Sequence, residues 1–240
     1  MSTRFASTNA WNYRRAGDAG IIELAAWRGA GSLALRPHFH DETQIVVVLS
    51  GSRAFRVNGV TVMVTPGHAA LIPAGVLHTP MATPDQETVC LNAYVAPSPF
   101  CASVRIARIG QRWRSPDEIA PEHILGIVDE ILSREPSRPA AAGDVMKLGA
   151  TLTESVERIG KIAAGFGRSR EGFSRMVRRE LGVSPHAFRV LARLNLARHL
   201  LRRGEPIAAV AADAGFSDQS HLTRLFRRTF GTTPGVYWHD

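Results

Sequence analysis

The chain has 240 residues, of which 45% are hydrophobic, so it can bury the cores of two modest domains. No apolar run reaches the ~20 residues that cross a bilayer, and the first residues lack the apolar stretch of a secretory signal, so we expect a cytoplasmic protein without membrane contact. The net charge of +8 is concentrated in residues 158–240, where 15 basic and 6 acidic residues give +9, which indicates either a polyanion partner or a solvated basic surface.

Residues 1–110 have the pattern of a β domain. Short runs rich in Val, Ile and aromatic residues are separated by turn residues, and they predict strands over 21–27, 44–49, 53–57, 60–64 and 88–95. Asn58-Gly59 lies between two of these runs and predicts a tight hairpin, because both turn positions need a positive φ.

Residues 111–143 form a second segment with a helical period. Apolar side chains in residues 121–133 recur at i, i+1, i+4, i+7 and i+8, and these are Ile124, Leu125, Val128, Ile131 and Leu132. The sequence EPSRPAAAG at residues 135–143 predicts a linker, and residues 144–157 predict a weaker helix that opens the third segment, 144–240.

The last eighty residues contain an internal repeat, in which residues 163–185 match residues 211–234. Such a repeat predicts two copies of one supersecondary module. In the second copy Pro206 suits the first turn of a helix, Gly215 permits a left-handed turn, and Ser217 is the predicted N-cap of a helix over 218–230. A short helix, a glycine turn and a second helix with a polar face is the helix-turn-helix pattern.

The first copy repeats this pattern, with Ser169 as the predicted N-cap of its second helix. A long helix is predicted between the copies, over residues 184–204. Its length of about 30 Å is close to the ~34 Å between successive major-groove faces. The two modules could therefore enter adjacent turns of one groove face.

The outward faces of the two second helices carry the predicted DNA contacts, unless they are ordinary solvated surface. Arginine and short polar residues reach base edges, and arginines further along each helix suit phosphates. The first stripe comprises Glu171, Ser174, Arg175 and Arg178, and the second comprises Ser220, Thr223, Arg224 and Arg227. The residues assigned to phosphates are Arg178, Arg179, Arg227 and Arg228.

Residues 158–238 resemble the AraC-type DNA-binding domain, most closely in GFSDQSHLTRLFRRTFGTTPGVY at residues 215–237. The resemblance implies a transcription regulator. It places base reading at Gln219, Ser220, Thr223 and Arg224 in the second motif, and at Arg170, Glu171, Ser174 and Arg175 in the first. Arg168 replaces an apolar turn residue and Gly172 lies inside the recognition helix, so the first motif departs from the family pattern.

Helices that follow the β domain often form the dimer in this family, so the resemblance implies a homodimer through the apolar stripe of residues 121–133. The alternative is that the stripe packs on its own β domain.

The β region resembles the two cupin motifs. The first match contains His38, His40 and Gly51, with Gln44 in place of the usual carboxylate; the second contains Gly67, Pro73, Gly75 and His78 but lacks a later Asn. The resemblance implies an α+β chain, in which a cupin-like β-barrel is followed by an all-α domain with two helix-turn-helix motifs.

The mouth of that barrel is the predicted sensor site. Three imidazoles and one oxygen donor could hold a divalent metal, with His38, His40, Gln44 and His78 as ligands. Because Gln is a weaker ligand than a carboxylate, we expect no cofactor and instead a metal-free pocket for a small-molecule effector. Its predicted lining is Arg36, His38, His40, Gln44, Pro73 and His78.

The main prediction is thus a non-enzymatic, effector-controlled transcription regulator. The alternative is a metal-dependent cupin enzyme, such as a dioxygenase or isomerase, with a helical appendage. A third hypothesis is a regulator that responds through the thiols of Cys90 and Cys101.

Overall fold

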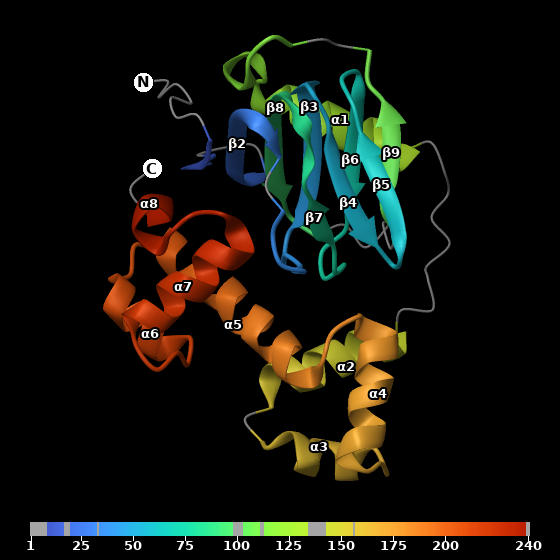
Figure 1. The fold of residues 1–240 in the computed structure, drawn as a ribbon, viewed down its shortest axis with the longest axis vertical. Helices are drawn as coiled ribbons and strands as arrows, with labels where there is room; N and C mark the ends of the chain where they lie inside the picture. Colours follow the sequence, from blue (N-terminus) through green and yellow to red (C-terminus); the bar gives the residue numbers. More distant parts are fainter. Residues whose placement is uncertain are drawn as a thin grey trace.

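The computed structural model describes residues 9–16, 20–32, 34–97, 103–110, 113–133, 143–155 and 157–238. A β unit is followed by a helical unit, whose orange and red helices lie beyond one end of the strands (Figure 1). No helix in these ranges is long and apolar enough to cross a membrane.

The β unit consists of two antiparallel sheets. The six-stranded sheet has the order β1(Ala10–Arg15), β2(Ile21–Ser32), β8(Thr83–Val95), β3(Thr43–Ser50), β6(His68–Ile72), β9(Arg105–Arg108). The three-stranded sheet has the order β5(Val60–Val64), β4(Arg53–Val57), β7(Thr79–Met81). Among the described strands the two sheets do not join into a closed barrel, and the predicted α+β class, a cupin-like β domain followed by a helical domain, is confirmed.

All five predicted strands are present, and the hairpin at Asn58-Gly59 joins β4 to β5 with both residues at positive φ. Strands β1, β6, β7 and β9 were not predicted from the sequence. Three of these, β6, β7 and β9, have five residues or fewer, and runs this short show little periodicity.

Helix α1(Pro121–Ser133) covers one face of the six-stranded sheet, following the short 3₁₀ turn at Pro116–Glu118. Ile124 and Ile131 are buried against this sheet, and Ile127 joins them in place of the predicted Val128. Ile124 and Ile131 therefore pack on their own β domain, as the alternative interpretation predicted, and they are not available to a dimer. Leu125, Val128 and Leu132 remain half-buried.

The helical unit contains the two predicted modules. Its helices are α2(Gly143–Glu154), α3(Ile159–Gly165), α4(Arg170–Leu181), α5(Pro185–Arg202), α6(Ile207–Asp213), α7(Gln219–Phe230) and α8(Pro234–Trp238). The predicted linker lies outside the described residues except for residue 143, which begins α2.

The helix caps follow the sequence signals with one correction. Ser169 caps α4 by accepting a hydrogen bond from the Gly172 N–H, and Gly182 and Gly231 end α4 and α7 in the left-handed region. The prediction that Ser217 caps α7 is wrong. The carboxylate of Asp218 accepts from the His221 N–H instead, and the Ser217 hydroxyl donates to Asp218. The carboxylate is the stronger acceptor for this N–H, because it carries a negative charge.

One hydrophobic core runs from the inner face of the sheets into the helical unit. Phe39 of the β unit stacks on Phe188 of α5 at 4.9 Å, and the Tyr13 hydroxyl donates to the Phe230 carbonyl at 3.0 Å. The helical unit thus closes the open end of the β unit.

Candidate DNA-reading face and sensor pocket

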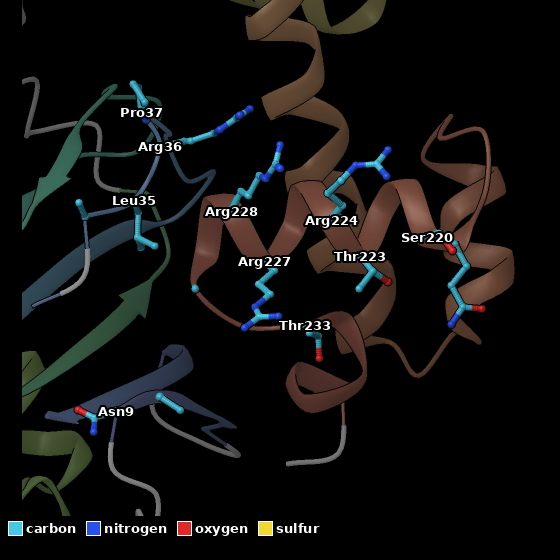
Figure 2. Close-up of a pocket in the computed structure, with 14 residues that line it drawn as sticks. Asn9, Leu35, Arg36, Pro37, Ser220, Thr223, Arg224, Arg227, Arg228 and Thr233 are labelled. Atoms are coloured by element: carbon cyan, nitrogen blue, oxygen red, sulfur yellow. The ribbon is translucent and has the colours of Figure 1, made fainter.

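Helix α7 presents its predicted reading face to an open groove of about 1390 Å³ (Figure 2). Leu222, Phe226 and Phe230 are buried on the opposite side, so the polar face turns outward. The predicted residues that line the groove are Gln219, Ser220, Thr223, Arg224, Arg227 and Arg228. The lining contains four arginines and no acidic residue, which suits the phosphates and guanine edges of DNA.

Helix α4 repeats this arrangement. Phe173 and Val177 are buried, whereas the predicted contact residues Arg170, Glu171, Arg175, Arg178 and Arg179 are exposed and Ser174 is half-buried. Both copies of the repeat therefore bury the same side and expose the side predicted to bind DNA.

The opposite wall of the groove belongs to the β unit. The segment 34–37 lies beside the end of α7, and the Arg36 N–H donates to the Arg228 carbonyl at 3.3 Å. The Arg36 side chain is exposed and extends along the groove toward Arg228 (Figure 2). The structure thus places Arg36 beside the predicted DNA contacts of α7, and not in the lining of the histidine pocket.

The other predicted sensor residues come together, except one. His38, His40, Gln44 and His78 line a closed pocket inside the β unit, whereas Pro73 is buried outside its lining. The ring centroids of the three histidines lie 4.5 to 5.3 Å apart. His38 and His78 face each other because their backbones form an isolated β-bridge.

The hydrogen bonds of the rings fix their tautomers. His38 Nδ1 donates to the Arg36 carbonyl at 2.7 Å, and His78 Nδ1 donates to the Val76 carbonyl at 3.0 Å, so both keep a free lone pair on Nε2. His40 differs, because its Nδ1 accepts from Arg198 Nη1 at 2.8 Å. A neutral His40 therefore carries its proton on Nε2.

This arrangement does not suit a divalent metal, although ligand atoms of the three histidines lie within 4.8 Å of one another. The Nδ1 of His40 is engaged by Arg198 and its Nε2 is protonated, so it offers no free lone pair. The charges of Arg198 and Arg53 also act on these rings. A cation would be repelled there, whereas an anion would be attracted.

The same surroundings keep the histidines neutral. Burial lowers the pKa of His78 to about 4, with a further contribution from Arg53. Burial, and then the charge of Arg198, lower the pKa of His40 well below its ordinary value. Burial and the neighbouring His78 do the same to the pKa of His38.

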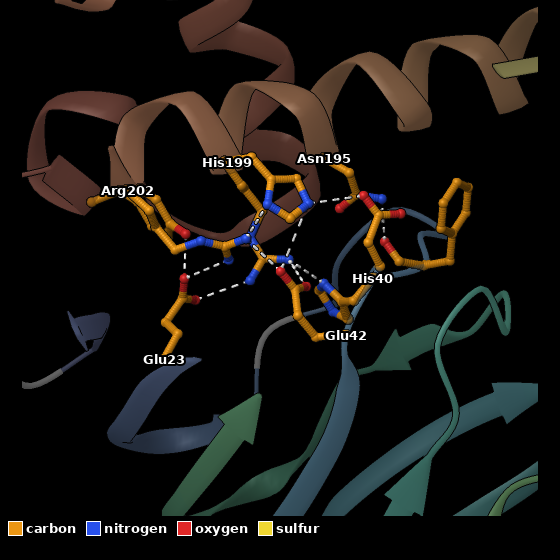
Figure 3. Close-up of polar contacts among 10 residues, drawn as sticks. Glu23, His40, Glu42, Asn195, His199 and Arg202 are labelled. Carbon is orange, nitrogen blue, oxygen red and sulfur yellow. Dashed lines mark hydrogen bonds and ion pairs between the residues drawn. The ribbon is translucent and has the colours of Figure 1, made fainter. Parts of the chain in front are cut away.

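A buried ion cluster beside the pocket joins the two units (Figure 3). Arg198 of α5 lies 3.0 Å from a carboxylate oxygen of Glu23 and 3.2 Å from one of Glu42. Arg202 pairs with the same two carboxylates, and the Tyr237 hydroxyl donates to Glu23. Asn195 adds a hydrogen bond to the Phe39 carbonyl at 3.1 Å.

The charges in this cluster hold each other ionised. Burial acts to raise the pKa of Glu42, but Arg198 and Arg202 lower it below its ordinary value. Burial opposes the charge of Arg198, but Glu23, Tyr237 and Glu42 raise its pKa well above the ordinary value.

This cluster was not predicted from the sequence. The spacing of Asn195, Arg198 and Arg202 at i, i+3 and i+7 indicates one polar face on the long helix. Arg198 also lies between Leu194 and Leu201, which are buried with it.

Comparison with known proteins identifies the two units. The AraC-like ligand binding domain matches residues 20–121, and a helix-turn-helix domain matches residues 162–239. The chain belongs to the AraC-type family of transcription regulators. This AraC-type regulator has its ligand-binding domain at the N-terminus and its DNA-binding domain at the C-terminus.

Its relatives support this assignment. The AraC-type chain is 24% identical over 228 residues to the probable transcriptional regulator LumQ of Photobacterium leiognathi, covering 83% of this chain and 90% of LumQ. It is 23% identical over 234 residues to the transcriptional regulator NimR of Escherichia coli strain K12, covering 87% of this chain and 84% of NimR. ToxT of Vibrio cholerae strain SCE256, in its structure with bound unsaturated fatty acid, shares the fold with a TM-score of 0.60 and 12% identity, over 99% of this chain and 97% of ToxT.

Proposed function

We propose that this AraC-type regulator reads a specific DNA site with α4 and α7, and that a small molecule in the histidine pocket controls this binding. The observation that carries the proposal is the groove along α7, which is lined by four arginines and no acidic residue. In this assignment α7 supplies the principal base contacts, because α4 contains the half-buried Gly172 within its first turn.

Control by a ligand is supported by the contact between pocket and reading helix. Phe230, the last residue of α7, lines the same pocket as His38 and His40. A molecule that enters the pocket therefore meets the end of the helix that reads DNA. A bound fatty acid is found in ToxT, which has the same fold.

The experiment that tests DNA reading compares Arg224→Ala with Arg228→Ala on a site selected from genomic fragments and on random DNA. Arg224 lies in the first half of α7 and should contact guanine, so its loss should cost ~1–3 kcal/mol on the selected site and little on random DNA. Arg228 lies near the helix end and should contact a phosphate, so its loss should weaken both DNAs alike and reduce the salt slope by about one.

Arg203→Ala is the matched control, because Arg203 is exposed and lies outside the groove. Equal weakening of both DNAs by Arg224→Ala would refute the base contact. Unchanged affinity in both groove variants would refute DNA binding through α7.

The proposal includes the absence of a resident metal and of enzymatic activity. Three neutral histidines beside two arginines are a poor cation site, which disfavours the metal-dependent cupin enzyme. Thiol sensing is also disfavoured, because Cys90 is buried and burial raises the pKa of its thiol to about 11. Cys101 lies outside the described residues.

We further propose that the regulator acts in the cytoplasm as a homodimer. Leu125, Val128 and Leu132 lie at i, i+3 and i+7 on one stripe of α1 and pack partly against their own β unit, and the part of each side chain that stays exposed is available to a partner. A second copy would cover this stripe.

A further inference from the structure

The pocket contains a buried cation that has no counter-charge among the described residues. Arg53 of β4 is 1% exposed, and it forms no ion pair with any acidic residue in the described part of the chain. Its guanidinium lies between the rings of Trp11 and Phe55, each with its centroid 5.2 Å away. The aromatic faces partly stabilise the charge, but its N–H groups on Nε and Nη1 have no acceptor within the described structure.

Two further donors line the same pocket and also lack an acceptor in the described part of the chain. They are the indole N–H of Trp11 and Nε2 of His40, which carries a proton because Arg198 occupies Nδ1. Buried donors are normally satisfied, and a buried charge normally has a partner. Several unsatisfied donors around one cation form a binding site for an anion.

The pocket also offers acceptors. The amide oxygen of Gln44 and Nε2 of His78 are buried and have no donor among the described residues. A ligand that combines an anionic group with a hydroxyl would satisfy both kinds of group. A carboxylate without a hydroxyl would satisfy the donors alone.

The pocket is closed by a part of the DNA-binding domain. Its free volume is about 10 Å³, which leaves room for no more than about one water molecule. The ring of Phe230 fills the remaining space, stacked on His40 at 5.9 Å and edge-on to His38 at 5.8 Å. A ligand larger than one water molecule therefore needs space that a lining side chain now fills, and Phe230 is the lining residue from the DNA-binding domain.

We propose that the pocket around Arg53, Trp11 and His40 binds a small organic carboxylate, which takes the place of the Phe230 ring. The carboxylate accepts from Arg53 and His40, and its body occupies the space against Phe55. Because Phe230 ends α7, the ligand and the docked recognition helix compete for one pocket. This inference rests on the proposed function only for its consequence in DNA binding; the anion site stands on its own.

The test is a calorimetric titration of the full chain with acetate and benzoate, and with their neutral counterparts acetamide and benzamide. Charge-assisted hydrogen bonds should favour each acid over its amide by about tenfold or more. Arg53→Met should remove that preference. Arg56→Met should keep it, because Arg56 lies on the same strand but is exposed.

A second pair of variants tests the competition. Phe230→Leu and Phe230→Ala should bind the acids more tightly than the unaltered protein, since less or none of the ring has to be displaced. If instead the ligand packs onto the Phe230 ring, both variants should bind the acids more weakly than the unaltered protein, and displacement of the ring would be refuted. Phe230→Leu keeps most of the apolar packing, so the test remains available if Phe230→Ala does not fold.

The stability of the ligand-free protein gives an independent readout. Arg53→Met should leave the melting temperature unchanged or raise it, because an unpaired buried charge is replaced by an apolar side chain. A large decrease would show that Arg53 has a structural partner, and would overturn the inference.

Equal affinity for the acids and their amides would also overturn the inference. So would a result in which neither Phe230 variant binds acetate or benzoate at millimolar concentration. A gel shift of the ligand-free protein on its selected DNA site distinguishes failure of the proposed function from failure of the anion site. Loss of that shift refutes DNA binding and leaves the anion site untouched.

Discussion

Replacement of Arg198 by Met is the sharpest test of how the two units are joined. The charges of Arg198, Arg202, Glu23 and Glu42 sum to zero, and three of these side chains are at most 3% exposed. Without Arg198, the two buried carboxylates share the single positive charge of Arg202, and one buried negative charge is uncompensated. Breaking a buried pair in this way costs ~3–5 kcal/mol.

The matched control is Arg203→Met at the end of the same helix. Arg203 is 72% exposed and lies 3.6 Å from the half-buried Glu205, so its loss should cost between 0 and about 1 kcal/mol. Urea unfolding at pH 7.5 measures both variants. A loss in Arg198→Met no larger than in the control would refute the buried-charge argument.

The pH dependence of the stability deficit, meaning the free energy of unfolding lost in Arg198→Met, gives a second check. In Arg198→Met the uncompensated buried charge should raise the folded pKa of one carboxyl above its unfolded value, so this carboxyl keeps its proton in the folded state to higher pH. The deficit should therefore be small at low pH and grow as pH rises through that pKa, by at most ~1.4 kcal/mol per pH unit. Adding Glu42→Gln removes the uncompensated negative charge and leaves Arg202 paired with Glu23, so it should recover part of the stability. A pH-independent deficit would show that lost packing, rather than charge, causes the destabilisation.

Three further predictions concern other parts of the molecule. Burial lowers the folded pKa of His78 to about 4, so the unfolded chain binds more protons than the folded chain between pH 6.5 and 4. As pH falls through this window, His78 alone should lower the free energy of unfolding by roughly 3 kcal/mol, and urea unfolding of His78→Asn should show a smaller decrease. Asp218→Ala should lower the melting temperature more than Ser217→Ala, since Asp218 caps α7; the reverse order would contradict the observed cap. Leu125→Glu with Val128→Glu should convert dimers to monomers in sizing chromatography without loss of fold, and a monomeric unaltered protein at micromolar concentration would exclude the dimer.

The sequence by itself determined the elements whose cause is local. The repeat, the glycine turns and the Ser169 cap specify two helix-turn-helix modules, because helix ends and turns depend on residues within one or two turns of each other. The hairpin at Asn58-Gly59 follows from the same kind of signal. The alternation of His38 and His40 along the chain likewise indicated that both would share one pocket.

The tertiary structure alone decided which groups in the pocket are charged, paired or blocked. Arg198 and Glu23 are 175 residues apart in the sequence, and Phe230 reaches the histidines from the opposite end of the chain. Local pattern cannot show that Arg53 is buried without an ion-pair partner among the described residues while Arg56, three residues later, faces solvent. Burial is a property of the packed units, and burial is what turns these polar side chains into a tautomer, an ion cluster and a candidate anion site.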